Sequence, residues 1–487
     1  MNRLFVLAIA ALLCPRSGLV SAESNASLAP AGWDSGVRLA EPPDLNPDPR
    51  VLEIDLTAKI ASVEVAPGTR VNAWTYNGGL PGPLVRARVG DRLIVHFKNE
   101  LPQPTTVHWH GVRVPIEMDG VPGISQPDVQ TGETFTYEFM LRDAGLYWYH
   151  PHVMSAAQVG FGLYGALLVE DPEDGVGIAD QLTLVLSDVG FDKSGTLESA
   201  ESGGPAGMVF GREGAYLLVN GKVMPRLRAR SGAPQRWRIV NTAKSRFFFL
   251  DLEGQPFVKI GSDGGLQETP VTTDALLVTP GERVDVIVTP TGTPKSTLIL
   301  RAMLYNRGYG SVEFRSVEEI MTIELSDQPT LSKRTSPAVA RTITPPSADG
   351  ATHVDIVLTL PPQDSNGQSE FRVNGVPYWK AKPYLAKLGE TQLWTIKNDT
   401  KWDHPFHLHG YFFMPVDDKG LPIRPMQWKD TINIPMETTA RFLVVFDERP
   451  GQWMFHCHIL DHADGGLMGT VNVGGVKAIE HVHKPGR

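Results

Sequence analysis

Residues 451–468, GQWMFHCHILDHADGGLM, limit what this chain can fold into more than any other stretch. They place a thiol, Cys457, between His456 and His458, and add His462 five residues after the cysteine. In an extended strand successive side chains point to opposite faces, so Cys457 would face away from the two flanking histidines. One strand could therefore join two transition-metal sites.

The cysteine content supports metal ligation by Cys457. The other cysteine, Cys14, lies in residues 1–22, where a basic start, an apolar run and a small-residue end at Ala22 are typical of a cleaved signal peptide. This segment is too short for a stable membrane span. We therefore expect a periplasmic or secreted protein, without a membrane span in its mature form, whose single thiol cannot form an internal disulfide.

Length and charge set the domain number and exclude one class of partner. A chain of 487 residues suggests about three domains. Acidic residues outnumber basic residues by 54 to 45, and removal of residues 1–22 takes away two arginines but no carboxylate. Nucleic-acid binding needs a basic surface, so we expect no nucleic-acid partner.

Short apolar strands dominate the chain and predict an all-β fold. Each strand is rich in β-branched or aromatic residues and is bounded by Gly, Pro, Asn or Asp, as in sandwiches and barrels. Five clear examples lie at 93–99, 134–141, 182–189, 283–290 and 440–446. Two proline-rich stretches are predicted to be irregular: an extended arm at 23–50 and a linker at 327–350.

An internal repeat indicates three related units. Each copy has an Asn-Gly pair, a glycine before an apolar strand, and an asparagine after it. The copies are Asn77-Gly78, Gly90 and Asn99; Asn220-Gly221, Gly232 and Asn241; and Asn374-Gly375, Gly389 and Asn398. Positions nine and eleven after the last asparagine are histidines in copies one and three and leucines in copy two: His108 and His110, Leu250 and Leu252, His407 and His409. Copies one and three are thus predicted to carry metal, while copy two is structural.

Four short stretches hold ten of the 14 histidines. They are TTVHWHG (His108, His110), GLYWYHPH (His150, His152), WDHPFHLHG (His404, His407, His409) and HCHILDH (His456, His458, His462). The spacing H-x-H projects both imidazoles to one face of a strand, so four such pairs from two units could enclose a metal cluster. Cys457, His462 and His404 would form a separate His2Cys site, the ligand set of blue copper centres.

These four motifs, which extend over nearly the whole mature chain, resemble those of the multicopper oxidase family. The resemblance implies three cupredoxin-like Greek-key domains in tandem, at 51–172, 173–326 and 351–487, and four coppers per chain. It implies type 1 ligands His404, Cys457 and His462 and type 2 ligands His108 and His407. It assigns the type 3 pair to His110, His150, His152, His409, His456 and His458.

The resemblance also implies an oxidase that takes single electrons from a donor and reduces O2 to water. A phenol or aromatic amine needs little more than an exposed edge of a type 1 histidine, His462, so a laccase-like activity is the expected one. A metal-ion oxidase acting on Cu(I), Fe(II) or Mn(II) is the nearest alternative, although the chain lacks a methionine cluster. The other alternative is a non-enzymatic periplasmic copper-binding protein.

Proton supply and the axial position of the type 1 site are less closely defined by the motifs. Asp119 matches a proton-supplying acid of bacterial relatives, and Asp461 or Asp464 could replace the glutamate that many of them carry where this chain has Ala463. The resemblance places the axial position ten residues after the thiol, where this chain has Leu467, which would leave copper without a fourth ligand. A slip of one residue would bring in Met468 instead.

Overall fold

The computed structural model describes residues 37–191, 196–199, 202, 204–308, 316–331, 341–362 and 370–479. The predicted signal peptide, the first part of the predicted arm and part of the predicted linker lie outside these residues. Residues 37–50, the described part of the predicted arm, form bends and a turn. Within the described residues, no helix is long and apolar enough to cross a membrane.

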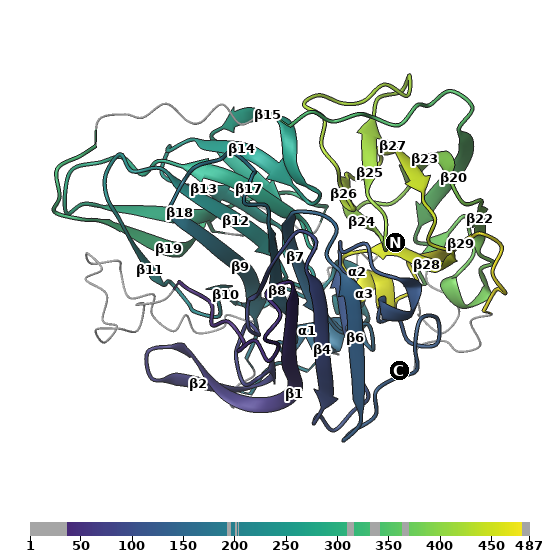
Figure 1. The fold of residues 1–487 in the computed structure, drawn as a ribbon, viewed down its shortest axis with the longest axis horizontal. Coiled ribbons are helices and arrows are strands. Elements are labelled where there is room, and N and C mark those ends of the chain that lie inside the picture. The colour runs from purple at the N-terminus through teal and green to yellow at the C-terminus, as the bar shows by residue number, and fades with distance from the viewer. Residues whose placement is uncertain are drawn as a thin grey trace, which may run out of the picture.

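Strands far outnumber helices in the described residues, and they form three pairs of sheets in tandem, as cupredoxin-like domains do. In Figure 1 the first unit (purple to blue) lies below, the second (teal) to the left and the third (green to yellow) to the right. The first unit pairs the sheet β2-β1-β4-β6 with the sheet β3-β8-β7-β5. Its elements are β1 (Val51–Ala66), β2 (Thr69–Tyr76), β3 (Val85–Arg88), β4 (Arg92–Asn99), β5 (His108–His110), η1 (Ile116–Met118), β6 (Thr134–Met140), β7 (Gly145–His150), α1 (Ser155–Gly160) and β8 (Gly165–Glu170).

The second unit pairs a six-stranded sheet, β10-β9-β12-β17-β14-β15, with a five-stranded sheet, β11-β19-β18-β13-β16. Its elements are β9 (Gln181–Val189), α2 (Gly204–Phe210), β10 (Tyr216–Val219), β11 (Arg226–Ala229), β12 (Gln235–Asn241), β13 (Phe248–Asp251), β14 (Phe257–Ser262), β15 (Gly265–Thr273), β16 (Ala275–Val278), β17 (Arg283–Val288), β18 (Thr297–Met303) and β19 (Glu318–Leu325). Leu250 and Leu252, which replace the H-x-H pair, are fully buried in the apolar core between these sheets. Their position agrees with a structural role for this copy of the repeat.

The third unit pairs the sheets β21-β20-β23-β27-β25 and β22-β29-β28-β24-β26. Its elements are β20 (Thr352–Thr359), β21 (Arg372–Val373), η3 (Tyr378–Lys380), β22 (Tyr384–Ala386), β23 (Glu390–Asn398), β24 (His404–Leu408), β25 (Phe413–Val416), β26 (Thr431–Ile434), β27 (Thr439–Phe446), β28 (Gly451–Cys457), α3 (Leu460–Asp464) and β29 (Met468–Val473). Stacked aromatic rings fill its core: Trp394 lies 5.8 Å from Phe442, and Phe413 lies 4.0 Å from the same ring.

The predicted internal repeat is confirmed in backbone geometry. Asn77, Asn220 and Asn374 all have φ between 50° and 54°, a left-handed conformation that asparagine tolerates. Each also accepts a hydrogen bond from the first strand of its own unit, from the amides of Thr57, Val185 and Val357 respectively. The same parallel pairing follows in every unit: β1 with β4, β9 with β12, and β20 with β23.

Candidate metal centres

Short strands of the first and third units carry most of the clustered histidines. In the first unit β5 pairs with β7 in antiparallel register, and His108 stands opposite His150. In the third unit β24 pairs with β28, and His407 stands opposite His456. Because facing residues of neighbouring antiparallel strands lie close together, each strand pair gathers imidazoles on one face.

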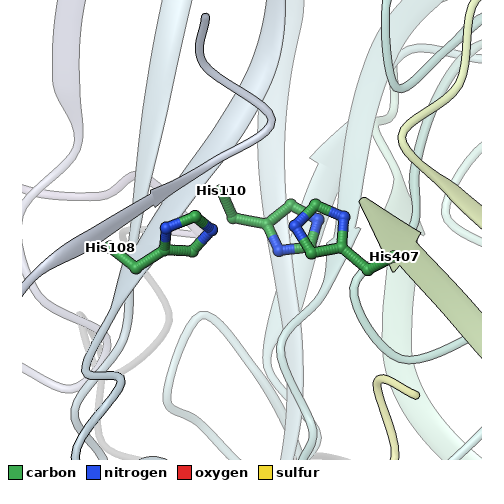
Figure 2. A group of neighbouring side chains, drawn as sticks. All are labelled: His108, His110 and His407. Atoms are coloured by element: carbon green, nitrogen blue, oxygen red, sulfur yellow. The ribbon is translucent and has the colours of Figure 1, made fainter. Parts of the chain in front are cut away.

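The rings of the two units meet face to face. His110 of the first unit stacks on His407 of the third, with ring centroids 3.7 Å apart and planes 13° apart, while His108 approaches from the side (Figure 2). His108 in turn stacks on His409, at 3.9 Å between centroids. The cluster therefore lies between the two units and belongs to neither alone.

Three groups of histidines in this cluster have nitrogens close enough to share a metal ion. Within each group all the ligand atoms lie within 4.8 Å of one another, and the groups are His108, His110 and His407; His110, His150 and His458; and His152, His409 and His456. The last two groups contain the six residues that the resemblance assigned to the type 3 pair. The first contains both residues that it assigned to type 2.

Several ring nitrogens in this cluster are buried without a hydrogen-bond partner, as expected for metal ligands. Buried polar atoms normally have a hydrogen-bond partner, and one without a partner costs free energy. Among the described residues, buried ring nitrogens without one are His108 Nε2, His110 Nδ1, His150 Nε2, His152 Nε2, His407 Nε2 and both nitrogens of His458. Lone pairs that converge without protein partners are the donor set that copper takes from neutral imidazole.

The protonation state of the rings also suits metal binding. Burial, followed by the charge of neighbouring imidazoles, lowers the pKa values of His110, His150, His409, His456 and His458 well below the usual range. The same causes lower the pKa of His152 to about 3. The rings are thus neutral near pH 7, and a metal ion need not displace protons from them.

The opposite nitrogen of several rings is held by the protein, which fixes the orientation of each ring. His108 Nδ1 lies 2.7 Å from the carbonyl oxygen of Asp119, and His407 Nδ1 lies 2.9 Å from that of Asp430. His456 Nδ1 lies 2.9 Å from the carbonyl oxygen of Cys457. Each contact directs the other nitrogen into the cluster.

Asp119 lies directly beside the cluster. It follows the short helix η1, and its carboxylate is 2.9 Å from His409 Nδ1 and 3.4 Å from His108 Nδ1. Burial raises the pKa of this carboxyl group, but the His409 and His108 imidazoles together lower it further, and the net direction is below the usual value. Of the three predicted acids, Asp119 is the one that contacts the clustered imidazoles.

The other two predicted acids bridge units instead. Asp461 forms an ion pair with Arg212 and accepts a hydrogen bond of 3.0 Å from Ser245 Oγ, both in the second unit. Asp464 accepts a 3.0 Å hydrogen bond from the amide of Ala156, in α1 of the first unit. Burial raises the pKa of Asp464 to about 7. These partners do not place either carboxylate at the imidazole cluster.

A second site contains the thiol. His404 Nδ1 lies 3.4 Å from Cys457 Sγ, His462 Nδ1 lies 3.7 Å from it, and the two imidazole nitrogens are 3.2 Å apart. All three side chains are buried, with 2% exposure for Cys457 and none for the histidines. Burial raises the pKa of the thiol, so a metal ion bound here would displace its proton.

The two candidate axial residues face different surroundings. Leu467 is 1% exposed and packs in the same apolar cluster as Cys457. The amide of Cys457 also donates a 3.0 Å hydrogen bond to the carbonyl oxygen of Leu467. Met468 packs in a separate cluster with Tyr378 and Met454. This arrangement favours Leu467 at the thiol site.

The structure corrects one sequence prediction, that His462 has an exposed edge. The His462 ring has 0% exposure. Its Nε2 donates a 2.9 Å hydrogen bond to the carbonyl oxygen of Val209, in α2 of the second unit. Figure 1 shows α2 beside α3, the helix that carries His462. The motif could not reveal this, because the covering helix is about half the chain away.

The sequence also failed to identify a buried ion pair at the cluster. Arg283 of the second unit forms a bidentate pair with Asp430 of the third, and Asp430 Oδ1 is 3.1 Å from His110 Nε2. A charged pair, Lys429-Asp430, next to a buried strand is a weak signal in the sequence. Its partner lies 147 residues away, and no spacing rule connects them.

Comparison with known proteins agrees with this geometry. Family models described as multicopper oxidase match residues 57–174, 180–313 and 349–476. The chain is 30% identical to the multicopper oxidase MmcO of Mycobacterium tuberculosis, with 86% of each chain covered. It is 28% identical to a laccase of Bacillus subtilis, over 84% of this chain and 91% of the relative.

A solved structure with the same fold is a multicopper oxidase of Campylobacter jejuni described as a metallo-oxidase. Its TM-score is 0.79 at 28% identity, and the match covers 89% of this chain and 94% of the other. The three family models together cover well over half of this chain, in the order of its three pairs of sheets. The chain therefore belongs to the multicopper oxidase family.

Proposed function

We propose that this protein holds four coppers, takes single electrons from a donor at the Cys457 site, and reduces O2 to water at the eight-histidine cluster. The observation that carries the proposal is the separation of the eleven side chains into one His2Cys group and three imidazole groups. One copper would be held by His404, Cys457 and His462, and three by the cluster.

Bound copper supplies the one-electron redox steps and the metal surface at which O2 is reduced. The chain supplies the connection between the sites. Cys457 is joined by single peptide bonds to His456, in β28, and to His458, directly after it; both rings belong to the cluster groups, whereas the sulfur belongs to the thiol group. Electrons thus have a covalent path of a few bonds from the thiol site to the cluster.

The surrounding residues exclude water from the cluster and would pass protons to it. Reduction of O2 by four electrons consumes four protons, so an acid must reach a site whose imidazoles are almost all buried. Asp119 contacts His108 and His409 through its side chain, and we assign it this role. Asp461 and Asp464 act mainly in joining α3 to the other two units.

The burial of His462 favours a metal ion as the electron donor. A bulky phenol needs direct contact with an exposed ring edge, but here the Val209 carbonyl and α2 cover that edge. A small cation such as Fe(II), Cu(I) or Mn(II) needs only oxygen or sulfur ligands near the Val209 carbonyl group. The description of the Campylobacter jejuni structure as a metallo-oxidase is consistent with this assignment.

A laccase-like activity on phenols or aromatic amines is the second candidate. The Bacillus subtilis relative, itself a laccase, covers 84% of this chain. One aromatic ring, Phe371, lies 4.4 Å from His462, and a second aromatic residue, Phe210, follows Val209, whose carbonyl oxygen accepts the His462 hydrogen bond. Displacement of α2 would be needed before such a donor could reach His462.

An absorption spectrum and oxygen uptake test both parts of the proposal. Copper-loaded protein should show an intense band near ~600 nm from the thiolate site and a shoulder near ~330 nm from the coupled pair. Oxygen uptake should be faster with Fe(II), Cu(I) or Mn(II) than with a phenolic dye. Absence of the blue band in protein carrying four coppers would refute the oxidase function, and faster uptake with the dye would favour the laccase-like activity.

A further inference from the structure

The second unit contributes none of the eleven proposed copper ligands, yet its strand β17 extends to the cluster. Arg283, the first residue of β17, is 1% exposed and lies among all three units. Its Nε donates to the carbonyl oxygen of Leu146 in the first unit, at 3.0 Å. Both terminal nitrogens donate to the carboxylate of Asp430 in the third unit, one of them at 2.6 Å.

Every N–H of the Arg283 guanidinium has a described acceptor. The two remaining hydrogen bonds run from Nη1 to the carbonyl oxygen of Gly281 and from Nη2 to that of Asp263, each 3.1 Å long. A guanidinium carries five donors in a fixed plane, so the five acceptors define its orientation. Bidentate pairing then fixes the plane of the Asp430 carboxylate.

Asp430 in turn contacts one ligand from each side of the cluster. Its Oδ1 lies 3.1 Å from His110 Nε2, and its backbone carbonyl oxygen lies 2.9 Å from His407 Nδ1. Both ring nitrogens must be protonated to donate these bonds. The free lone pair of His110 is then on Nδ1, and that of His407 is on Nε2. Neither of these two atoms has a described protein partner.

The backbone before Arg283 approaches the same rings. Gly281 has φ of +84°, and a Cβ added there would meet the His458 ring at 2.8 Å and the His110 ring at 3.2 Å. A Cβ at Gly111, next to His110, would lie 2.4 Å from Arg283 and 2.6 Å from Asp430. The second unit thus packs directly against two proposed ligands, and both approaches need glycine.

On this basis we propose that Arg283 is a positioning residue of the three-copper cluster: by holding Asp430 it fixes the tautomer and orientation of His110, through the Asp430 carboxylate, and of His407, through the Asp430 carbonyl oxygen. The proposal rests on the proposed function, because it takes both histidines as copper ligands. The middle unit would therefore contribute to metal binding without providing a ligand. Changes in residues that orient metal ligands typically weaken metal binding by roughly 10- to 100-fold.

Arg283→Met tests the proposal in the full-length copper-loaded protein. Copper per chain is measured after dialysis against a graded series of chelator concentrations, together with the type 1 and type 2 signals in electron paramagnetic resonance. We expect cluster copper to bind roughly 10- to 100-fold more weakly, with loss of the type 2 signal. The type 1 signal and the blue band should persist, because Arg283 makes no contact with Cys457, His404 or His462 among its described partners.

Arg236→Met is the matched control. Arg236 is also a buried arginine of the second unit, 3% exposed and paired with Asp285 and Asp174, but none of its described partners is a proposed ligand. The Arg236→Met substitution should lower the midpoint of thermal unfolding of the copper-free protein while leaving the ratio of the type 2 signal to the type 1 signal unchanged. A purely structural role for Arg283 would give the same pattern in both variants.

Arg283→Lys keeps the positive charge but not the paired N–H donors. This second variant is used if Arg283→Met does not fold. It should show weakened cluster copper with the type 1 signal retained. Wild-type cluster affinity in either Arg283 variant, or equal loss of type 1 and cluster copper, would overturn the proposal. Failure of the wild-type protein to show a blue band would instead overturn the proposed function.

Discussion

In many of the clustered imidazoles, one ring nitrogen contacts a carbonyl or carboxylate oxygen of the protein. Each of these rings can therefore offer a metal ion only its other nitrogen. His108, His407 and His456 all use Nδ1 for the protein contact. His110 differs, because Asp430 and Thr431 engage its Nε2 and leave Nδ1 free. The choice of donor atom is thus set by residues that spacing alone does not identify.

At the thiol site, Leu467→Met is expected to lower the type 1 reduction potential. A leucine donates nothing to copper, whereas a thioether binds weakly and offsets the preference for Cu(I). If the new ligand favours Cu(II) about tenfold, the potential falls by ~59 mV for this one-electron couple. Redox titration of the blue band in wild type and variant measures this directly.

Met468→Leu is the control for that titration. Met468 packs with Tyr378 and Met454 rather than with the thiol, so its replacement should leave the potential unchanged. If the potential rises in Met468→Leu and does not fall in Leu467→Met, the assignment of the axial position is wrong.

Among the elements, strand β28 was largely predictable and helix α2 was not. The alternation of β28 follows from strand geometry, and it correctly separated Cys457 from His456 and His458. The α2 helix has no histidine or cysteine, and its sequence GPAGMVF has no pattern that indicates a cover for a metal site. Its effect depends on a contact between Val209 and His462, which are 253 residues apart.

Loosening α2 should increase the oxidation of bulky phenols. Phe210 ends this helix, and its ring lies 5.8 Å from Trp402 in the third unit. Phe210→Ala removes this contact and should make the His462 edge more accessible. We expect kcat/KM for a bulky phenol to rise about threefold to tenfold, on the order of 1 kcal/mol in barrier, with little change for Fe(II).

A suitable control is Phe191→Ala, which removes a similar ring contact, 5.0 Å from Tyr216, within the second unit. Equal gains in the two variants would point to general loosening of the second unit. An unchanged rate with phenol in Phe210→Ala would contradict the view that α2 restricts access.

For the whole molecule, the sequence was sufficient for the architecture and for the eleven residues that gather at the two sites. Local patterns carry that information, because strand alternation, Asn-Gly turns and H-x-H spacing all act within a few residues. The contacts between units escaped prediction. Arg283 with Asp430, Asp461 with Arg212, and Asp464 with Ala156 each join segments more than a hundred residues apart.

Removal of copper should destabilise the protein as a whole. The cluster lies between the first and third units, so bound metal stabilises their association as well as each site. A ligand present at a thousandfold excess over its Kd contributes about 4 kcal/mol to the free energy of unfolding. We expect the unfolding midpoint to fall by on the order of 10 °C in the copper-free protein.

Differential scanning calorimetry with and without a copper chelator measures this shift. The first and third units should also unfold in separate transitions once copper is removed, whereas the loaded protein should unfold more cooperatively. Identical traces for the two forms would show that copper does not connect the units.

The division of the cluster between residues 108–152 and 407–458 has a consequence for biosynthesis. A ribosome completes the first four histidines when more than half of the chain is still to be made. The thiol and its flanking imidazoles belong to the third unit and are translated after the whole of the second. A chain made only through its second unit therefore holds half of the imidazole cluster and no thiol site, so neither proposed copper site can have its full ligand set until the third unit has been made.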